Sequence, residues 1–240
     1  MTADLARTAT AAALGRYTEV LELTRGTEDP VLLVLRAVAL DRMGRIPEAL
    51  DCCSGAIEAT PLDADPWFVQ GFVLYRFSEF EQAAQSLDQA IRLAPSHVEA
   101  RFTLGNVRYG QGRLDEAIVC FEAVVALEPR HAKALYNIGV ALSDQGRFGE
   151  ALDYYDRVIA INESVPVVLL NRGICLARLE RLREAVEAFT RALDVDPRGA
   201  GAWHNKGLAL ARLGQDDEAK YCFAQSRALV GVQASPGVQP

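Results

Sequence analysis

The chain has 240 residues, of which 50% are hydrophobic and 24% are charged, and its formal net charge is −7. The hydrophobic share predicts a well-filled core, and the negative charge argues against nucleic acid as a partner. The five cysteines show no CxxC spacing, which argues against a disulfide framework and a zinc site. Because the sequence shows no secretory signal and no apolar run near the roughly 18 residues that a membrane span requires, we expect a cytoplasmic protein without a membrane partner.

Residues 1–29 contain the stretch ALGRYTEVLELTRG, which reads as the end of one helix, a tight turn at Gly15 and the start of another helix. The segment from Gly15 to Pro30 is about five residues shorter than its counterpart from Gly44 to Ala64. Terminal repeats of an array are commonly atypical because they cover its end. We therefore expect residues 1–29 to form a degenerate half-repeat that caps the array.

From Pro30 onward the sequence repeats every 34 residues, in the segments 30–63, 64–97, 98–131, 132–165, 166–199 and 200–233. Each segment has an apolar-periodic run, a turn and a second such run, which predicts a helical hairpin. The turn place, where a residue able to adopt positive φ is favoured, holds Gly44, Ser78, Gly112, Gly146 and Gly214, and Glu180 is the exception. Residues 234–240 are rich in Gly, Pro and Ser, and this composition predicts a disordered tail.

Three places in each repeat follow a small-small-large pattern. The eighth residue is small, as Ala37, Gly71, Gly105, Gly139, Gly173 and Gly207; the twentieth is Ala49, Ala83, Ala117, Ala151, Ala185 and Ala219. Four residues later, on the same helical face, come Cys53, Leu87, Phe121, Tyr155, Phe189 and Phe223. We expect the small residues to bring helix backbones close together and the larger ones to fill the space between helices.

The period, the large residue at the fourth place (Trp67, Leu135, Leu169, Trp203), the small eighth residue, the regular alanine and the terminal prolines resemble the tetratricopeptide repeat. The resemblance covers residues 30–233. It implies an all-α, right-handed superhelical solenoid of antiparallel helix hairpins. In that arrangement the first helices line a concave groove and the second helices form the outer face. The function that the resemblance implies is a non-catalytic scaffold that binds a peptide segment of a partner protein.

The sixth place of the first helix holds Asn137, Asn171 and Asn205 in three consecutive repeats. An amide side chain both donates and accepts hydrogen bonds, so such a row can hold the backbone of an extended peptide. This row resembles the asparagine ladder with which some members of the family bind peptides. The alternative is that these asparagines are solvated or bonded to neighbouring turns.

Groove places of the second to fourth repeats hold aromatic residues, namely Phe68, Phe72, Tyr75, Phe102, Tyr109 and Tyr136, with Asn106 among them. An aromatic stripe of this kind is costly to leave in water, so we expect it to bind part of the partner. The alternative is that several of these rings tilt between the hairpins and belong to the core. One variant of the family binds the tail of a chaperone and uses basic residues to hold its terminal carboxylate. This variant is disfavoured here, because Phe102, Val167 and Asn171 stand where the resemblance requires those basic residues.

No combination of residues indicates catalysis, a metal site or a cofactor. His97 and His131 lie beside inter-repeat turns, and His204 lies in the groove without a nearby acidic cluster, so ordinary surface roles are expected. The last repeat lacks the polar capping helix that such arrays usually have, which makes its face a candidate surface for homodimerisation. Structural self-assembly through this repeat is therefore the alternative to a peptide-binding scaffold.

Overall fold

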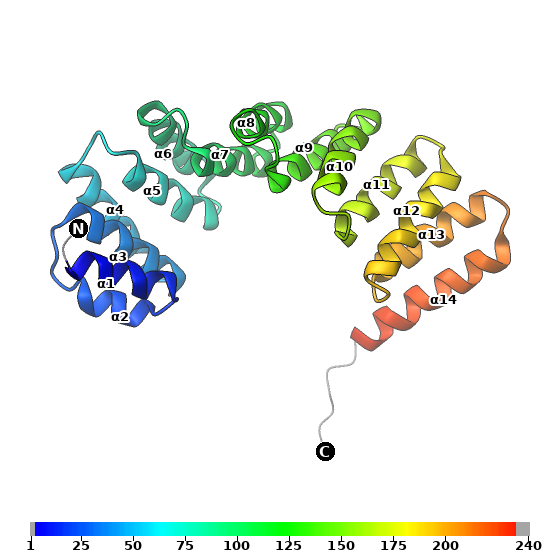
Figure 1. The fold of residues 1–240 in the computed structure, drawn as a ribbon, viewed down its shortest axis with the longest axis horizontal. Coiled ribbons are helices and arrows are strands. Elements are labelled where there is room, and N and C mark those ends of the chain that lie inside the picture. The colour runs from blue at the N-terminus through cyan, green and yellow to red at the C-terminus, as the bar shows by residue number, and fades with distance from the viewer. Residues whose placement is uncertain (1–2, 234–240) are drawn as a thin grey trace, which may run out of the picture. The chain divides into compact units, whose positions relative to one another are not determined.

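The computed structural model describes residues 3–233, and these residues form α-helices and no strand (Figure 1). The helices are α1 (Ala3–Ala13), α2 (Tyr17–Leu23), α3 (Pro30–Arg42), α4 (Ile46–Ala59), α5 (Ala64–Arg76), α6 (Phe80–Leu93), α7 (Val98–Gly110), α8 (Leu114–Leu127), α9 (Ala132–Asp144), α10 (Phe148–Ile161), α11 (Pro166–Arg178), α12 (Leu182–Val195), α13 (Ala200–Arg212) and α14 (Asp216–Gln233). The predicted all-α array of helix hairpins is confirmed. The tail predicted at 234–240 lies outside the described residues.

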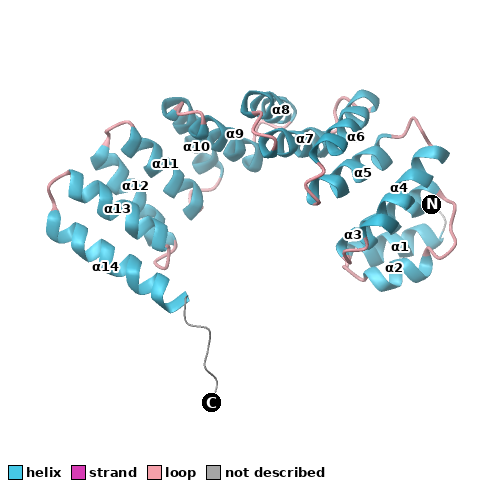
Figure 2. Cartoon of the chain, turned by 180° about the vertical axis from the view of Figure 1, so that it is seen from behind, coloured by secondary structure: helices cyan, strands magenta, loops and turns pink. Residues whose placement is uncertain are grey.

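The chain divides into two compact units, an N-terminal unit, Met1–Leu127, and a C-terminal unit, Glu128–Pro240. Short loops join consecutive helices (Figure 2). In the N-terminal unit the first helices of successive hairpins touch, α3 with α5 and α5 with α7, and in the C-terminal unit α11 touches both α9 and α13. Each unit therefore presents a continuous face of first helices, which we call its first-helix face.

The helix starts are fixed by proline and by side-chain caps. Pro30 and Pro166 occupy the first turns of α3 and α11, where a missing backbone N–H costs nothing. The carboxylate of Asp29 accepts hydrogen bonds from the backbone N–H groups of Val31 and Leu32, at 3.0 and 3.1 Å. These contacts satisfy donors that have no partner inside the helix.

Two histidines also cap helices, which corrects their prediction as ordinary surface residues. His97 Nδ1 accepts the backbone N–H of Ala100 at 3.2 Å and caps α7, and His131 Nδ1 accepts that of Ala134 at 3.0 Å and caps α9. Histidine is absent from the usual list of capping residues, so the sequence pattern did not indicate this role.

The turns between the paired helices of the six repeats all use a positive φ, including the turn at Glu180, which the sequence pattern marked as the exception. Four are glycines, but Ser78 and Glu180 adopt φ values of 61° and 62° with a Cβ present. The left-handed region is unfavourable for residues other than glycine. The period of the array thus overrides the local preference of the residue at these two places.

Residues 1–29, predicted to be a half-repeat, contain α1 and the seven-residue helix α2, joined at Gly15 with a φ of 69°. Val20 and Ala11 are buried together with Ala39 of α3. The guanidinium of Arg36 donates to the Leu21 carbonyl at 2.9 Å, which ties α2 to α3. This segment therefore covers the first full hairpin.

In five of the six repeats, the interior of the hairpin is built on a glycine that faces a large side chain. A Cβ added to Gly139 would lie 2.6 Å from Tyr155 Cε1, and one added to Gly173 would lie 2.5 Å from Phe189 Cε1. Gly71, Gly105 and Gly207 meet Leu87, Phe121 and Phe223 in the same way. The small and large residues predicted from the sequence are thus the two sides of one contact, and no side chain fits at the eighth place in these five repeats.

Candidate functional site

All ten predicted groove residues lie on first helices. In the N-terminal unit they are Phe68, Phe72 and Tyr75 on α5 and Phe102, Asn106 and Tyr109 on α7; in the C-terminal unit they are Tyr136 and Asn137 on α9, Asn171 on α11 and Asn205 on α13. The aromatic groove residues thus lie mainly in one unit and the asparagine row in the other, because only Tyr136 of the six aromatic residues lies in the C-terminal unit. Each first-helix face has its own chemical character.

The aromatic side chains of the N-terminal unit are only partly exposed. The Phe68 ring lies 4.7 Å from the His97 ring and 6.2 Å from the Phe72 ring, measured between centroids. The Phe102 ring packs 5.6 Å from that of Phe121, which belongs to the hairpin interior. These rings therefore contribute one side to packing within or between hairpins and leave another side accessible on the first-helix face.

The amide side chains of the C-terminal unit make contacts of their own. Asn171 Nδ2 donates to the hydroxyl of Tyr136 at 3.1 Å, which joins α11 to α9. Asn205 Nδ2 donates to the carbonyl of Gly201, one turn earlier on α13, at 2.8 Å. An amide nitrogen carries two N–H donors, so the single hydrogen bond of Asn205 leaves one of its N–H groups for a ligand.

A pocket of about 220 Å³ lies between α3 and α5 of the N-terminal unit. It is lined by Val38, Asp41, Arg42, Phe68, Val69, Phe72 and Val73. The Asp41 side chain is only 2% exposed and forms an ion pair with Arg76, while its Oδ1 has no hydrogen-bond partner among the described residues. We call this the N-terminal pocket.

A pocket of about 540 Å³ occupies the equivalent place between α11 and α13 of the C-terminal unit. Its lining is Ile174, Ala177, Arg178, Phe189, Asn205, Leu208, Ala209, Ala211 and Arg212. Ile174, Arg178 and Leu208 lie 136 residues, or four 34-residue repeats, after Val38, Arg42 and Phe72. We call this the C-terminal pocket.

Sequence reasoning missed both pockets and the arginines beside them. The sequence feature that could have indicated them is the thirteenth place of the repeat. In chain order this place holds Arg42, Arg76, Gly110, Asp144, Arg178 and Arg212. The two consecutive pairs of arginines coincide with the two pockets. Finding them requires the knowledge that the thirteenth place of one helix faces the next first helix.

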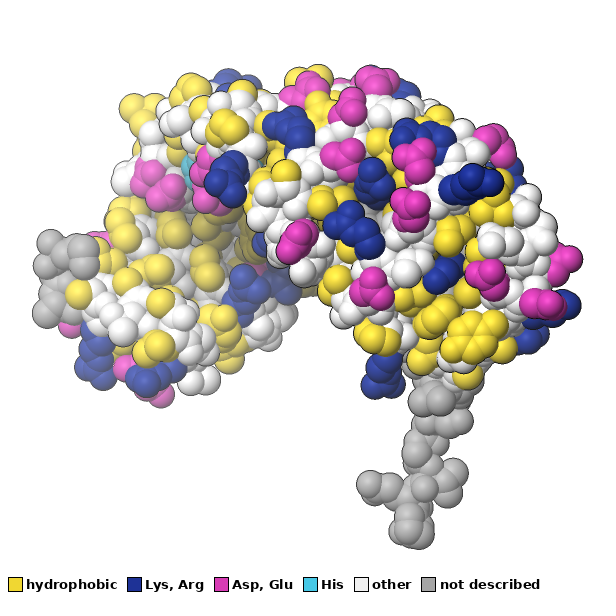
Figure 3. All heavy atoms as spheres, turned by 45° about the vertical axis from the view of Figure 1, so that its right-hand side comes forward, with side chains coloured by type: hydrophobic (Ala, Val, Ile, Leu, Met, Phe, Trp, Pro, Cys, Tyr) yellow, Lys and Arg dark blue, Asp and Glu magenta, His cyan; other side chains and the backbone are white. Residues whose placement is uncertain are grey.

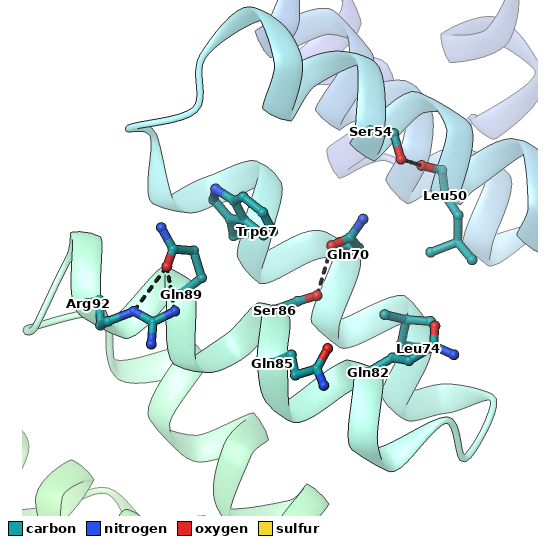
Figure 4. A pocket seen from close by; sticks show the side chains of 10 residues that line it. All are labelled: Leu50, Ser54, Trp67, Gln70, Leu74, Gln82, Gln85, Ser86, Gln89 and Arg92. Carbon is teal, nitrogen blue, oxygen red and sulfur yellow. Dashed lines mark hydrogen bonds between the residues drawn. The ribbon is translucent and has the colours of Figure 1, made fainter.

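A wider hollow of about 790 Å³ lies on the opposite side of the N-terminal unit, between α4 and α6 (Figure 4). Several glutamines line it. Ser86 Oγ donates to Gln70 Oε1 at 2.8 Å, and the Arg92 guanidinium donates to Gln89 Oε1 at 2.6 and 3.0 Å. Much of its hydrogen-bonding capacity is thus used within the protein, and its lining contains no carboxylate, histidine or thiol.

The thiols of the chain are poorly suited to nucleophilic chemistry. Burial raises the pKa of Cys53 to about 12 and that of Cys120 to about 11, so both stay protonated near neutral pH. Among residues 3–233 no group of three or more His, Cys, Asp or Glu side chains could hold a metal ion. In the same part of the chain, no helix is long and apolar enough to cross a membrane.

A tetratricopeptide repeat model matches the sequence at residues 34–98, 68–119, 102–166 and 170–222. The chain belongs to the tetratricopeptide repeat family. Proteins of this family act generally as scaffolds for protein interactions. No curated protein matches its sequence.

Several solved structures resemble the chain. YrrB, described as a TPR protein with an unusual peptide-binding site, is 26% identical, with a TM-score of 0.67 over 75% of this chain and 93% of YrrB. MamA from Desulfovibrio magneticus is 23% identical, with a TM-score of 0.69 over 72% and 97% of the two chains. Pseudomonas aeruginosa PilF is 17% identical, with a TM-score of 0.70 over 83% and 91%. The last two similarities establish the fold alone.

Proposed function

We propose that the chain is a non-catalytic adaptor that holds a peptide segment of a partner protein along its first-helix faces. The observation that carries this proposal is the placement of the ten groove residues on first helices, which contact one another within each unit. The peptide-binding site described for YrrB supports it, since that protein shares the fold at 26% identity.

The two faces would hold different parts of the peptide. In the C-terminal unit, Asn137, Asn171 and Asn205 offer amide groups to the peptide backbone, which binds without selecting side chains. In the N-terminal unit, the accessible sides of the Phe68, Phe72 and Phe102 rings favour apolar side chains. The partner segment would therefore combine an apolar stretch with a polar, extended one.

A peptide selected from a phage-displayed random library against the immobilised protein provides the test. The triple variant Asn137→Ala, Asn171→Ala, Asn205→Ala should lose at least about tenfold in affinity for it, because several backbone hydrogen bonds are removed at once. A matched control removes three amides from the outer hollow, as Gln82→Ala, Gln85→Ala and Gln89→Ala (Figure 4). Equal binding by both variants, with unchanged helicity, would count against the proposal.

Self-assembly through the last repeat is a second candidate, and the surface of α14 favours it. Tyr221 and Val230 are 58% and 54% exposed on this helix, which packs against α13. Figure 3 shows apolar side chains gathered close to where the described chain ends. Sedimentation velocity over a concentration series decides: a species that stays monomeric, and is unchanged by Tyr221→Glu, excludes this function.

A further inference from the structure

We propose that the N-terminal and C-terminal pockets are two equivalent anchor sites, each of which takes one bulky apolar side chain of a peptide that carries a carboxylate beside it. The inference rests on the proposed peptide-binding function and specifies the chemistry of the partner. It predicts that one chain binds two short acidic-apolar peptide segments.

The size and lining of the N-terminal pocket fit an apolar side chain. Val38, Phe68, Val69, Phe72 and Val73 supply its apolar surface. An apolar protein cavity of about 150 Å³ is large enough to bind benzene. The volume of about 220 Å³ in this pocket therefore admits one side chain of the size of leucine or phenylalanine.

The charges of the N-terminal pocket leave one cation without a partner. Arg76 is engaged by the buried carboxylate of Asp41. The guanidinium of Arg42, which lines the same pocket, forms no hydrogen bond or ion pair within the described part of the chain. A guanidinium binds a carboxylate through two parallel hydrogen bonds, so an acidic group next to the apolar anchor is the complementary ligand.

The C-terminal pocket repeats this arrangement with different residues. Ile174, Leu208 and Ala209 supply apolar surface, and Leu208 is 45% exposed, although it is a large aliphatic side chain. Arg212 is engaged by Glu180. Arg178 lines the pocket, and across residues 3–233 its guanidinium has no hydrogen-bond or ion-pair partner.

Arg42 and Arg178 differ from the arginines that precede several second helices. Arg45, Arg147 and Arg181 each bind the glutamate three residues later, at 2.6 Å. In a chain with a net charge of −7, a free arginine at the same repeat position of two separate pockets is a recurrent feature of the fold.

The test is a titration of the full chain with the peptide Ser-Gly-Leu-Glu-Gly-Ser, acetylated at its N-terminus and amidated at its C-terminus. Binding is measured by calorimetry and by changes in amide NMR shifts. We expect two sites per chain, with shifts confined to α3, α5, α11 and α13. Replacing the peptide's leucine by alanine, or its glutamate by lysine, should weaken binding about tenfold or more, because the apolar or charge-assisted contact is lost.

The matched variants are Arg42→Gln and Arg178→Gln, each expected to remove one of the two sites, with Arg45→Gln as the control outside the pockets. Equal binding of the lysine peptide, shifts on other helices, or a self-association that the two variants abolish would overturn the inference. If these variants bind the library-selected peptide normally while the triple asparagine variant does not, the pockets carry no recognition and the proposed function still stands. If neither the arginine variants nor the triple asparagine variant weakens binding of the selected peptide, both the inference and the proposed function are rejected.

Discussion

The two units use one repeat in complementary ways. Inside the hairpins, the large side chain grows along the chain, from Cys53 and Leu87 to the aromatic rings of Phe121, Tyr155, Phe189 and Phe223. On the first-helix faces the aromatic rings lie at the other end of the chain. They dominate the N-terminal unit, whereas amides dominate the C-terminal unit. The interior keeps its register while its residues change in size, so the two units differ in chemistry mainly on their exposed faces.

The largest effect is expected when the interior contact of the C-terminal unit is overfilled. Gly139→Ala would place a Cβ 2.6 Å from the Tyr155 ring, which is buried and rigid, and should destabilise the protein by about 1–3 kcal/mol in chemical denaturation. Gly71→Ala meets Leu87 at the same distance of 2.6 Å, but an aliphatic chain can change rotamer, so its loss should be smaller.

Gly149→Ala is the control for this pair, since no atom lies within 4 Å of the added Cβ. It should stabilise α10 by up to about 1 kcal/mol, because alanine has the higher helix propensity. Equal losses for Gly139→Ala and Gly71→Ala would show that ring rigidity does not distinguish the units.

The histidine caps should contribute equally to both units. His97→Ala and His131→Ala each remove the acceptor for a backbone N–H and should cost about 1 kcal/mol of unfolding free energy. Asn at either place provides a short acceptor and should restore most of the loss. A denaturation midpoint unmoved by alanine, or not recovered by asparagine, contradicts the capping role.

The two strained turns should respond differently to glycine. Ser78→Gly should stabilise the N-terminal unit by about 1 kcal/mol, because it relieves a φ of 61°. Glu180→Gly relieves a similar φ of 62° but also removes the ion pair with Arg212, so its net gain should be smaller. Thermal melting of the two single variants measures the difference, and a larger gain at Glu180 would be inconsistent with a stabilising pair.

The smallest effect concerns alkaline pH. Burial raises the pKa of Cys53 from 9.0 to about 12, so its contribution to stability is complete below pH 9 and is lost as the pH rises from there toward 12. The loss from this thiol is about 0.4 kcal/mol at pH 9 and grows above it. Denaturation at pH 7 and pH 9 should therefore show a weaker pH dependence for Cys53→Ala than for the native chain.

Much of the fold could be predicted from the sequence, because a strict 34-residue period determines where each helix begins and where each turn needs a positive φ. Ser78 follows from its place in the repeat, whereas Glu180 departs from the expected residue type and still adopts the same backbone conformation. The division after Leu127 could not be predicted, because Pro129 ends its repeat like the other prolines. The candidate site was predicted less completely. The groove residues follow from helix positions, whereas the pockets depend on contacts between residues of successive repeats.

The capping histidines have a practical consequence. Because Nδ1 of His97 and His131 accepts a backbone N–H, the neutral ring of each must carry its proton on Nε2. The two rings lie in different units, at the starts of α7 and α9. Nitrogen-15 spectra that distinguish the imidazole tautomers would thus observe each unit separately, and they would show whether the two units unfold together or one after the other.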